Sequence, residues 1–299
     1  MRRMNRKKIL QALLLAVLCC ALAGCWIIGK RHEQGQAPKA EPEIPMSEEE
    51  FRENFPYLAV TRADHETDSG EAQPLDLSGQ KEGSELLISG GSWILSGKMT
   101  GRIRIDAEEQ TVHLILDGVN LLSKEGPAIW AESAGKVIIT LKEGTENVIS
   151  DAGDYRKTPD LEACIQSNAD LTFNGTGALT VSGLYKDAIR SKNVVKVLDG
   201  QITLRCKRSG IHWTDGIHVT GGELDISSEK NGLRTTKNGI DGRGDLVIAG
   251  GSHRIIAGRH AFLVGRGDLY IYDCTIQEKS VVSTWNVGGE ARVQGGCIQ

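Results

Sequence analysis

The sequence predicts an all-β protein, a right-handed single-stranded parallel β-helix of about nine coils, and three observations lead to this fold class. Short runs in which apolar and polar residues alternate indicate strands with one side in water. No window after residue 60 shows sustained helical periodicity. A turn glycine recurs at intervals of 22 to 33 residues, at Gly91, Gly118, Gly144, Gly177, Gly200, Gly222, Gly251 and Gly296, with Cys274 in one slot of the series.

A repeat of this length with several short strands in each unit is typical of a solenoid. One coil cannot bury its apolar side alone, so the coils must stack, at a strand spacing of about 4.8 Å. Leucine-rich repeats share the period, but their Asn ladder and helical segment are missing here. We therefore expect the β-helix over residues 75–299, with inserted loops in the longer intervals 145–177 and 223–251.

Residues 1–24 have the pattern of a bacterial lipoprotein signal peptide. They hold five basic residues and no acidic ones, and the apolar run Ile9–Ala23 is interrupted only by Gln11. This run is too short to span a hydrocarbon core of ~30 Å comfortably. It ends at Leu22-Ala23-Gly24-Cys25, which resembles the lipobox of bacterial lipoproteins. The alternative is an ordinary signal peptide or a single anchor helix. The resemblance implies lipid on Cys25, a two-chain membrane anchor, and a mature protein outside the bacterial cytoplasmic membrane.

Residues 25–74 are predicted to form an acidic tether that contains proline. The segment 32–73 has eleven acidic and three basic residues and little apolar surface to bury. A short apolar group is the exception, and we expect it to dock on the following domain or to cap its first turn: Phe51, Phe55, Tyr57 and Leu58.

A ladder of large apolar residues follows the second strand of the coils and is interpreted as part of the interior: Ile129, Ile165, Ile189, Ile211, Leu233, Phe262 and Val282. The residue after each member should point outward. Because neighbouring parallel strands lie about 4.8 Å apart, Arg190, His212 and Arg234 are expected to form a cationic stripe on the outside of the solenoid.

This stripe is the candidate ligand-binding surface. Arginine binds carboxylates through its planar fork, and an aromatic ring can stack on a sugar. The candidate residues are Arg190, His212, Trp213, Arg234 and Trp130. The alternative is a solvated strand face whose arginines pair with nearby acidic residues.

Several stretches resemble one family, the bacterial extracellular carbohydrate-binding domain proteins. They are Leu116-Asp117-Gly118-Val119, residues 141–147 (LKEGTEN) with Ser150-Asp151, and residues 170–177 (DLTFNGTG). The family consists of calcium-containing parallel β-helices that are similar to pectate lyases and bind polysaccharide. Over residues 75–299 the resemblance implies an acidic or cellulosic plant or cell-wall glycan as ligand and calcium at the corners of the coils.

The carboxylates that would hold calcium are Asp187, Asp215, Asp245 and Asp268. Calcium takes 6–8 oxygen ligands, and at the corner where the family repeats Asp-Gly-Ile this chain keeps the carboxylate only at Asp187. Whether the chain binds calcium is therefore left open. For Asp245 and Asp268, in the twin Gly-Arg-Gly-Asp-Leu turns, the alternative is a carboxylate that accepts backbone N–H groups within a tight turn.

Composition removes other classes of function. Thirty-five Lys and Arg against 39 Asp and Glu do not favour a nucleic-acid binder. The histidines lack the spacing of a zinc site, and hydrolase and P-loop motifs are missing from the sequence. Cys274 and Cys297 lie on neighbouring coils and form a possible disulfide. The sequence stops in mid-coil at Gln299, which favours end-to-end self-association or a chain that continues.

Three functions remain open. The favoured one is a lipid-anchored protein that binds polysaccharide non-catalytically along a face of the rod. The second is a polysaccharide lyase or hydrolase of the same fold, with Arg190 or Arg234 as the base of a β-elimination. The third is a structural envelope rod or adhesin.

Overall fold

The structure is a computed structural model, which describes residues 46–68, 70–235 and 242–299. All of them belong to one structural unit, residues 40–299. The predicted signal peptide and Cys25 lie outside the described residues. Within the described ranges, the structure contains no helix that is long and apolar enough to cross a membrane.

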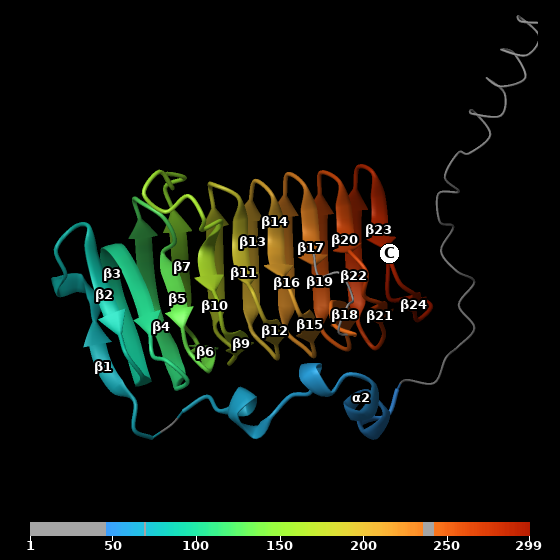
Figure 1. Cartoon of the computed structure of the whole chain (residues 1–299), viewed down its shortest axis with the longest axis horizontal. Coiled ribbons are helices and arrows are strands. Elements are labelled where there is room, and N and C mark those ends of the chain that lie inside the picture. Colours follow the sequence, from blue (N-terminus) through green and yellow to red (C-terminus); the bar gives the residue numbers. More distant parts are fainter. Residues whose placement is uncertain (1–45, 69, 236–241) are drawn as a thin grey trace, which may run out of the picture. The chain divides into compact units, whose positions relative to one another are not determined.

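The chain winds into a parallel β-helix, as predicted, in which successive coils add strands to three faces (Figure 1). Face 1 holds β6 (Lys136–Leu141), β9 (Asp170–Asn174), β12 (Val194–Val197), β15 (Gly216–Val219), β18 (Asp245–Ile248), β21 (Leu269–Ile271) and β24 (Ala291–Val293). Face 2 holds β7 (Glu146–Asp151), β10 (Ala178–Gly183), β13 (Gln201–Cys206), β16 (Glu223–Ser228), β19 (Ser252–Ala257) and β22 (Thr275–Ser280). Face 3 holds β5 (Ile129–Ser133), β8 (Ala163–Ser167), β11 (Asp187–Ser191), β14 (Ser209–Trp213), β17 (Asn231–Thr235), β20 (His260–Val264) and β23 (Ser283–Val287).

In the first coils, β3 (Gly91–Asp106) and β4 (Thr111–Ser123) are longer strands that pass from one face to the next. The short strands β1 (Gln73–Asp76) and β2 (Ser84–Ile88) pair with different parts of β3. The turn glycines keep the coils in register. Gly222 and Gly251 have φ angles of 74° and 89°, and a Cβ on Gly251 would lie 2.5 Å from the carbonyl oxygen of Gly222. Only glycine fits both the backbone angle and the close approach.

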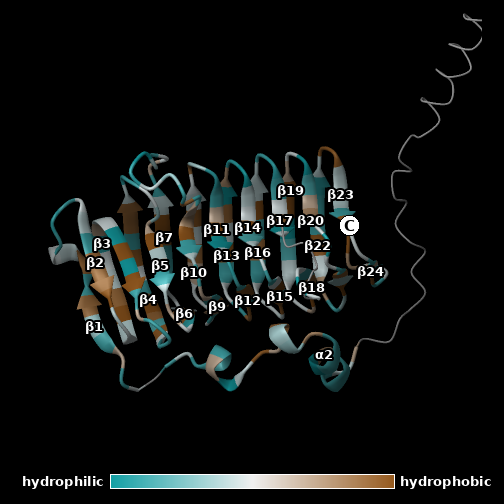
Figure 2. Cartoon of the chain, in the orientation of Figure 1, coloured by the Kyte–Doolittle hydropathy of each residue, from teal (hydrophilic) through white to brown (hydrophobic). Residues whose placement is uncertain are grey.

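The core lies between the three faces and consists of stacked apolar side chains. Along the strands, hydrophobic and hydrophilic residues alternate (Figure 2). On face 3, Ile189, Ile211, Leu233 and Phe262 stand in register on successive strands and are fully buried, which confirms the interior ladder.

The last member of that ladder was wrong. Val282 is 55% exposed, and the residue in register with Phe262 is Trp285. Val282 lies in the turn before β23, so the register of this strand lies three residues later than the sequence pattern indicates.

A segment that precedes the solenoid, residues 46–68, packs along the outside of face 1, and we call it the strap (Figure 1). It contains α2 (Glu48–Asn54) and the short 3-10 helices η1 (Pro56–Leu58) and η2 (Arg62–His65); a third, η3 (Leu77–Gly79), follows β1. Phe51 stacks on His218 with ring centroids 4.4 Å apart, and Phe55 meets Tyr270 edge-on at 5.0 Å. The predicted docking of the apolar group on the next domain is thus confirmed, on face 1.

The second half of the strap is held by an ionic contact. The fully buried carboxylate of Asp64 accepts hydrogen bonds from Lys136 (2.7 Å), Thr172 (2.6 Å) and Lys196 (3.0 Å), which lie on three successive strands of face 1. Burial opposes ionisation of Asp64, but the bonds from Lys136 and Thr172 outweigh it and hold its pKa well below the usual value. The strap therefore has an aromatic half and an ionic half.

Candidate functional site

Arg190, His212 and Arg234 lie side by side on the outer surface of face 3. In the strand register Arg190 pairs with His212, and His212 pairs with Arg234, so the three side chains occupy equivalent positions on β11, β14 and β17. Successive parallel strands are about 4.8 Å apart. The alignment predicted from the sequence is therefore present, but His212 is buried, and only the two arginines are partly exposed.

The two other positions proposed for binding differ from this pattern. Trp213 belongs to the core and is fully buried, so the expectation that it binds ligand is wrong. It comes one residue after His212 in a strand, and alternation turns it inward. Trp130 does lie on the outside of face 3, two strands from Arg190, but the guanidinium groups of Arg102 and Arg104 lie 5.7 and 5.5 Å from its ring centroid.

Two acidic residues sit among the arginines of the stripe. The Glu162 carboxylate forms ion pairs with Arg190, with Lys186 at 2.7 Å and with Arg208 at 2.9 Å. Arg190 is therefore paired, as the alternative interpretation of the stripe expects. Glu162 was not predicted, although it directly precedes β8 and stands in register with Lys186 and Arg208 on the next two coils.

The second acidic residue, Asp187, is fully buried and holds His212. Its carboxylate accepts hydrogen bonds from Arg208 Nε (2.8 Å), Ser209 N (3.0 Å) and His212 Nδ1 (3.0 Å). Burial opposes ionisation, but the bonds from Arg208 and His212 keep the pKa of Asp187 below its usual value. Burial lowers the pKa of His212 against the attraction of Asp187, so its imidazole is neutral at pH 7. Asp187 is thus a structural anchor of the stripe.

Arg234 differs from the rest of the stripe. It is half-buried, no acidic side chain forms an ion pair with it among the described residues, and its Nε is buried without a hydrogen-bond partner there. Burial and then the nearby Arg208 lower its pKa. Burial and the charges of Arg208 and Arg234 likewise lower the pKa of Arg190 to about 10. A guanidinium with an unused donor beside other cationic groups is suited to bind a carboxylate.

The four carboxylates named for calcium do not gather into one site, although Asp245 and Asp268 lie on neighbouring coils. Asp187 is engaged as described, Asp215 pairs with Arg243 at 2.7 Å, and Asp245 accepts bonds from the Tyr57 hydroxyl and from Asp268 N (2.6 Å). Across the described ranges, no cluster of three or more His, Cys, Asp or Glu side chains could hold a metal ion. Calcium takes six or more oxygens, so these residues do not fit a calcium site.

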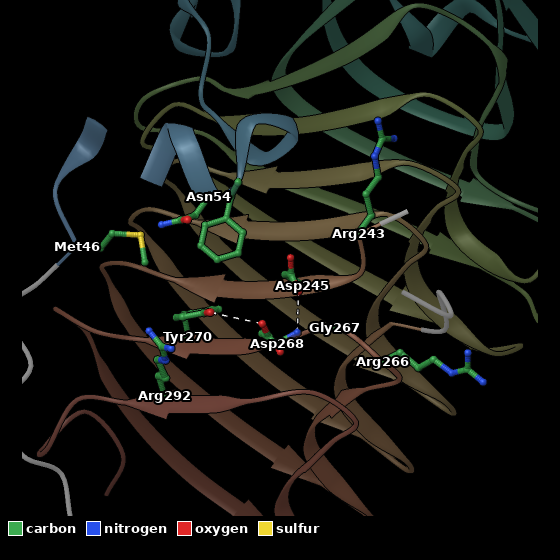
Figure 3. Close-up of a pocket in the computed structure, with 11 residues that line it drawn as sticks. Met46, Asn54, Arg243, Asp245, Arg266, Gly267, Asp268, Tyr270 and Arg292 are labelled. Atoms are coloured by element: carbon green, nitrogen blue, oxygen red, sulfur yellow. Dashed lines mark hydrogen bonds between the residues drawn. The ribbon is translucent and has the colours of Figure 1, made fainter. Parts of the chain in front are cut away.

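Asp245 and Asp268 match the alternative interpretation of the twin turns. Asp245 accepts the backbone N–H of Asp268, and Asp268 accepts that of Glu290 at 2.6 Å. Each carboxylate thus stabilises the turn of the next coil through a hydrogen bond to its backbone. The two side chains also line a pocket of about 370 Å³ between the strap and the last coils (Figure 3). The spacing of the repeat does not reveal this pocket, because one of its walls, with Met46, Asn54 and Phe55, comes from the strap.

Known proteins that resemble this chain share its fold and are described as carbohydrate-binding or polysaccharide lyase-like. A family model described as carbohydrate-binding domain-containing protein matches residues 82–288. A protein of Acetivibrio thermocellus with the same description is 36% identical over 121 residues, which cover 38% of this chain and 42% of that protein. The chain thus spans less than half of that relative's length. The solved structure of a polysaccharide lyase-like protein from C. thermocellum, a gadolinium derivative, is similar with a TM-score of 0.70 at 26% identity, over 75% of this chain and 97% of the other.

Proposed function

The chain belongs to the carbohydrate-binding domain-containing proteins, and on this premise we propose that it binds an acidic polysaccharide along face 3 without cleaving it. The observation that carries the proposal is Arg234, half-buried beside Arg190 and Arg208 and without an acidic partner among the described residues. A linear polymer with repeated carboxylates matches a cationic stripe that extends along a rod.

The charges around Arg234 favour an anionic glycan over a neutral one such as cellulose. Arg190, Arg208 and Lys186 share two carboxylates, those of Glu162 and Asp187, so the group carries excess positive charge before Arg234 is counted. A uronate carboxylate at the exposed part of the Arg234 guanidinium would reduce this excess. A neutral glycan would leave the excess charge unchanged, so the site would favour the acidic polymer.

The proposal includes the location of the protein. A lipid on Cys25 would anchor the chain to the outer face of the bacterial cytoplasmic membrane and leave the solenoid free to meet a glycan outside the cell. The Leu-Ala-Gly-Cys sequence at residues 22–25 supports this part of the proposal. Metabolic labelling with a fatty-acid analogue tests it, and a Cys25→Ser variant should carry no label.

The glycan proposal is tested by affinity electrophoresis in gels that contain polygalacturonate, with a cellulose derivative as the neutral comparison. Arg234→Gln should weaken retardation by polygalacturonate about tenfold, since a hydrogen bond to a charged group contributes roughly 1.5–3 kcal/mol. The double change of Arg190 and Arg234 to Ala should weaken it further. Arg254→Gln is the matched control, because Arg254 lies on face 2 and pairs with Asp225 at 3.1 Å. Equal retardation of the Arg234 variant and the control would refute the proposal.

One observation favours a second candidate, a polysaccharide lyase. Burial and the charges of Arg208 and Arg234 lower the pKa of Arg190 to about 10, toward the range of a base, whereas its ion pair with Glu162 favours the charged form. β-Elimination from a uronate creates a conjugated double bond that absorbs ultraviolet light. Binding without a gain in absorbance supports the non-catalytic binder, and a gain that disappears in Arg190→Lys supports the lyase.

A further inference from the structure

The pocket introduced above lies on face 1, around the corner from the arginine stripe. Its floor consists of outward-pointing side chains from the last coils, Asp245 at the start of β18, Asp268 in the turn before β21, and Tyr270 of β21. Its opposite wall is the strap, with Met46, Asn54 and Phe55 (Figure 3). A volume of about 370 Å³ is at the small end of the range for ligand sites, about 300–1,000 Å³.

Asp268 provides an acceptor with unused capacity. One of its oxygens accepts the backbone N–H of Glu290 at 2.6 Å, and within the described ranges the other accepts only the Tyr270 hydroxyl, at 3.4 Å. A carboxylate offers about four lone-pair sites, so this second oxygen can accept from a ligand hydroxyl. The bond to Glu290 fixes its direction.

Asn54 provides the facing group. It is exposed at the end of α2, its side chain makes no hydrogen bond to the residues that the structure describes, and Figure 3 shows it on the wall above the floor of the pocket. An amide both donates and accepts. Phe55 and Met46 beside it supply apolar surface for the C–H groups of a ligand.

The charges select the class of ligand. Two carboxylates, Asp245 and Asp268, form the floor, and two of the arginines at the rim already have partners: Arg243 pairs with Asp215, and Arg292 pairs with Glu290 at 3.0 Å. An anionic sugar would meet the floor with like charge. A cation would meet the arginines and find Asp245 already bound to Tyr57 and Asp268 N.

We propose that this pocket binds one neutral sugar residue through its hydroxyl groups. The second oxygen of Asp268 and the amide of Asn54 are its principal contacts, and Met46 with the edge of Phe55 provides the apolar surface. The site is separate from the stripe on face 3 and does not depend on it. A chain that carries both acidic and neutral sugars would therefore find two different sites on neighbouring coils.

The test is saturation-transfer difference NMR on the protein with methyl glycosides of galactose, glucose, arabinose, xylose and rhamnose, and with methyl galacturonoside as the anionic comparison. At least one neutral glycoside should receive saturation, and the anionic one should receive less. Asp268→Asn should weaken that binding about tenfold, because a charged acceptor is roughly twice as strong as a neutral one. Asp225→Asn, on face 2, is the matched control. Asn54→Ala is the second variant, because this exposed side chain supports no contact of the fold.

Three results would overturn the proposal: no saturation of any neutral glycoside, stronger binding of methyl galacturonoside, or unchanged binding in Asn54→Ala and Asp268→Asn. Arg234→Gln separates the two sites. It should leave neutral glycoside binding unchanged while it weakens retention by polygalacturonate. Failure of the stripe alone would abolish only the difference in polygalacturonate retention, whereas failure of the pocket alone would abolish only the glycoside signal.

Discussion

Replacement of Asp64 by Asn should release the ionic half of the strap from face 1. Asp64 is fully buried, and its partners Lys136 and Lys196 have side chains that are only 16% and 4% exposed. Asparagine keeps an acceptor for Thr172 and removes only the charge, so both lysines lose their counterion. Loss of one partner from a buried ion pair costs about 3–5 kcal/mol. The strands of the solenoid do not use this contact, so the cost falls on strap docking.

A cost of this size raises the fraction of undocked strap by roughly two to three and a half orders of magnitude, since each 1.4 kcal/mol is a factor of about ten. Trypsin measures this fraction, because Arg62 lies exposed in η2 and becomes a good substrate once the strap leaves face 1. Cleavage after Arg62 should accelerate in proportion, as proteolysis follows the open population when closing is fast. Far-ultraviolet circular dichroism should still show an intact β-helix.

Glu53→Gln is the matched control, because Glu53 is an exposed strap residue for which no side-chain contact is described, and the change from acid to amide is the same. Its cleavage rate should equal that of the wild type. If Asp64→Asn were cleaved after Arg62 no faster than Glu53→Gln, the ionic contact would contribute nothing to docking and the argument would fail.

Three further predictions concern the core, acid stability and the last coils. Phe262→Asp should abolish folding, because it puts an unpaired charge into a fully buried stack; a soluble variant with full β-structure would show that the interior ladder is misassigned. The pKa of Asp64 is lowered in the fold, so its contribution is complete above the unfolded value of about 3.9 and is lost as the pH falls through the folded value. The difference in urea midpoint between wild type and Asp64→Asn should therefore be large at pH 7 and shrink at pH below about 3; a difference independent of pH would contradict this. Oxidised glutathione should join Cys274 to Cys297, whose side chains interact across the last coils, fastest at alkaline pH because burial raises the pKa of Cys274; peptide mapping that shows no such link would refute it.

The fold was predictable because the repeat places the same physical demand on every coil. An apolar residue such as Ile189 or Ile211 must point inward, and a turn such as that at Gly222 accepts only glycine, so both leave a periodic trace in the sequence. The outer stripe followed from alternation alone. Trp213 shows the limit of this reasoning, because a tryptophan beside a histidine looks like a sugar platform until the inward direction of alternate side chains is taken into account.

The contacts that complete the site were not predictable, because they depend on side chains at the end of an inserted loop and in the strap, whose pairing the spacing of the repeat does not fix. Glu162 lies at the end of an inserted loop, and its pairing with Arg190 depends on how that loop folds back. The strap leaves no periodic trace either, although Asp64 and Phe55 make contacts to face 1 that the sequence pattern of the solenoid does not contain. Contacts between the nonrepeating strap and the repeating coils cannot be predicted from the spacing of residues in the sequence.

The direction of the strap fixes an order of events during folding. Its start contacts the last coils and its end joins the first coil, so Tyr57 bonds to Asp245, 188 residues later, and Lys196 bonds to Asp64, 132 residues away. A chain emerges with its N-terminus first, so the strap is available long before the surface that receives it exists. The early coils can stack on one another from local contacts, whereas the aromatic half of the strap must wait for β15, β18 and β21. Closure of the strap therefore reports that the late coils have formed, and an incompletely wound chain would be left with its strap open to proteases.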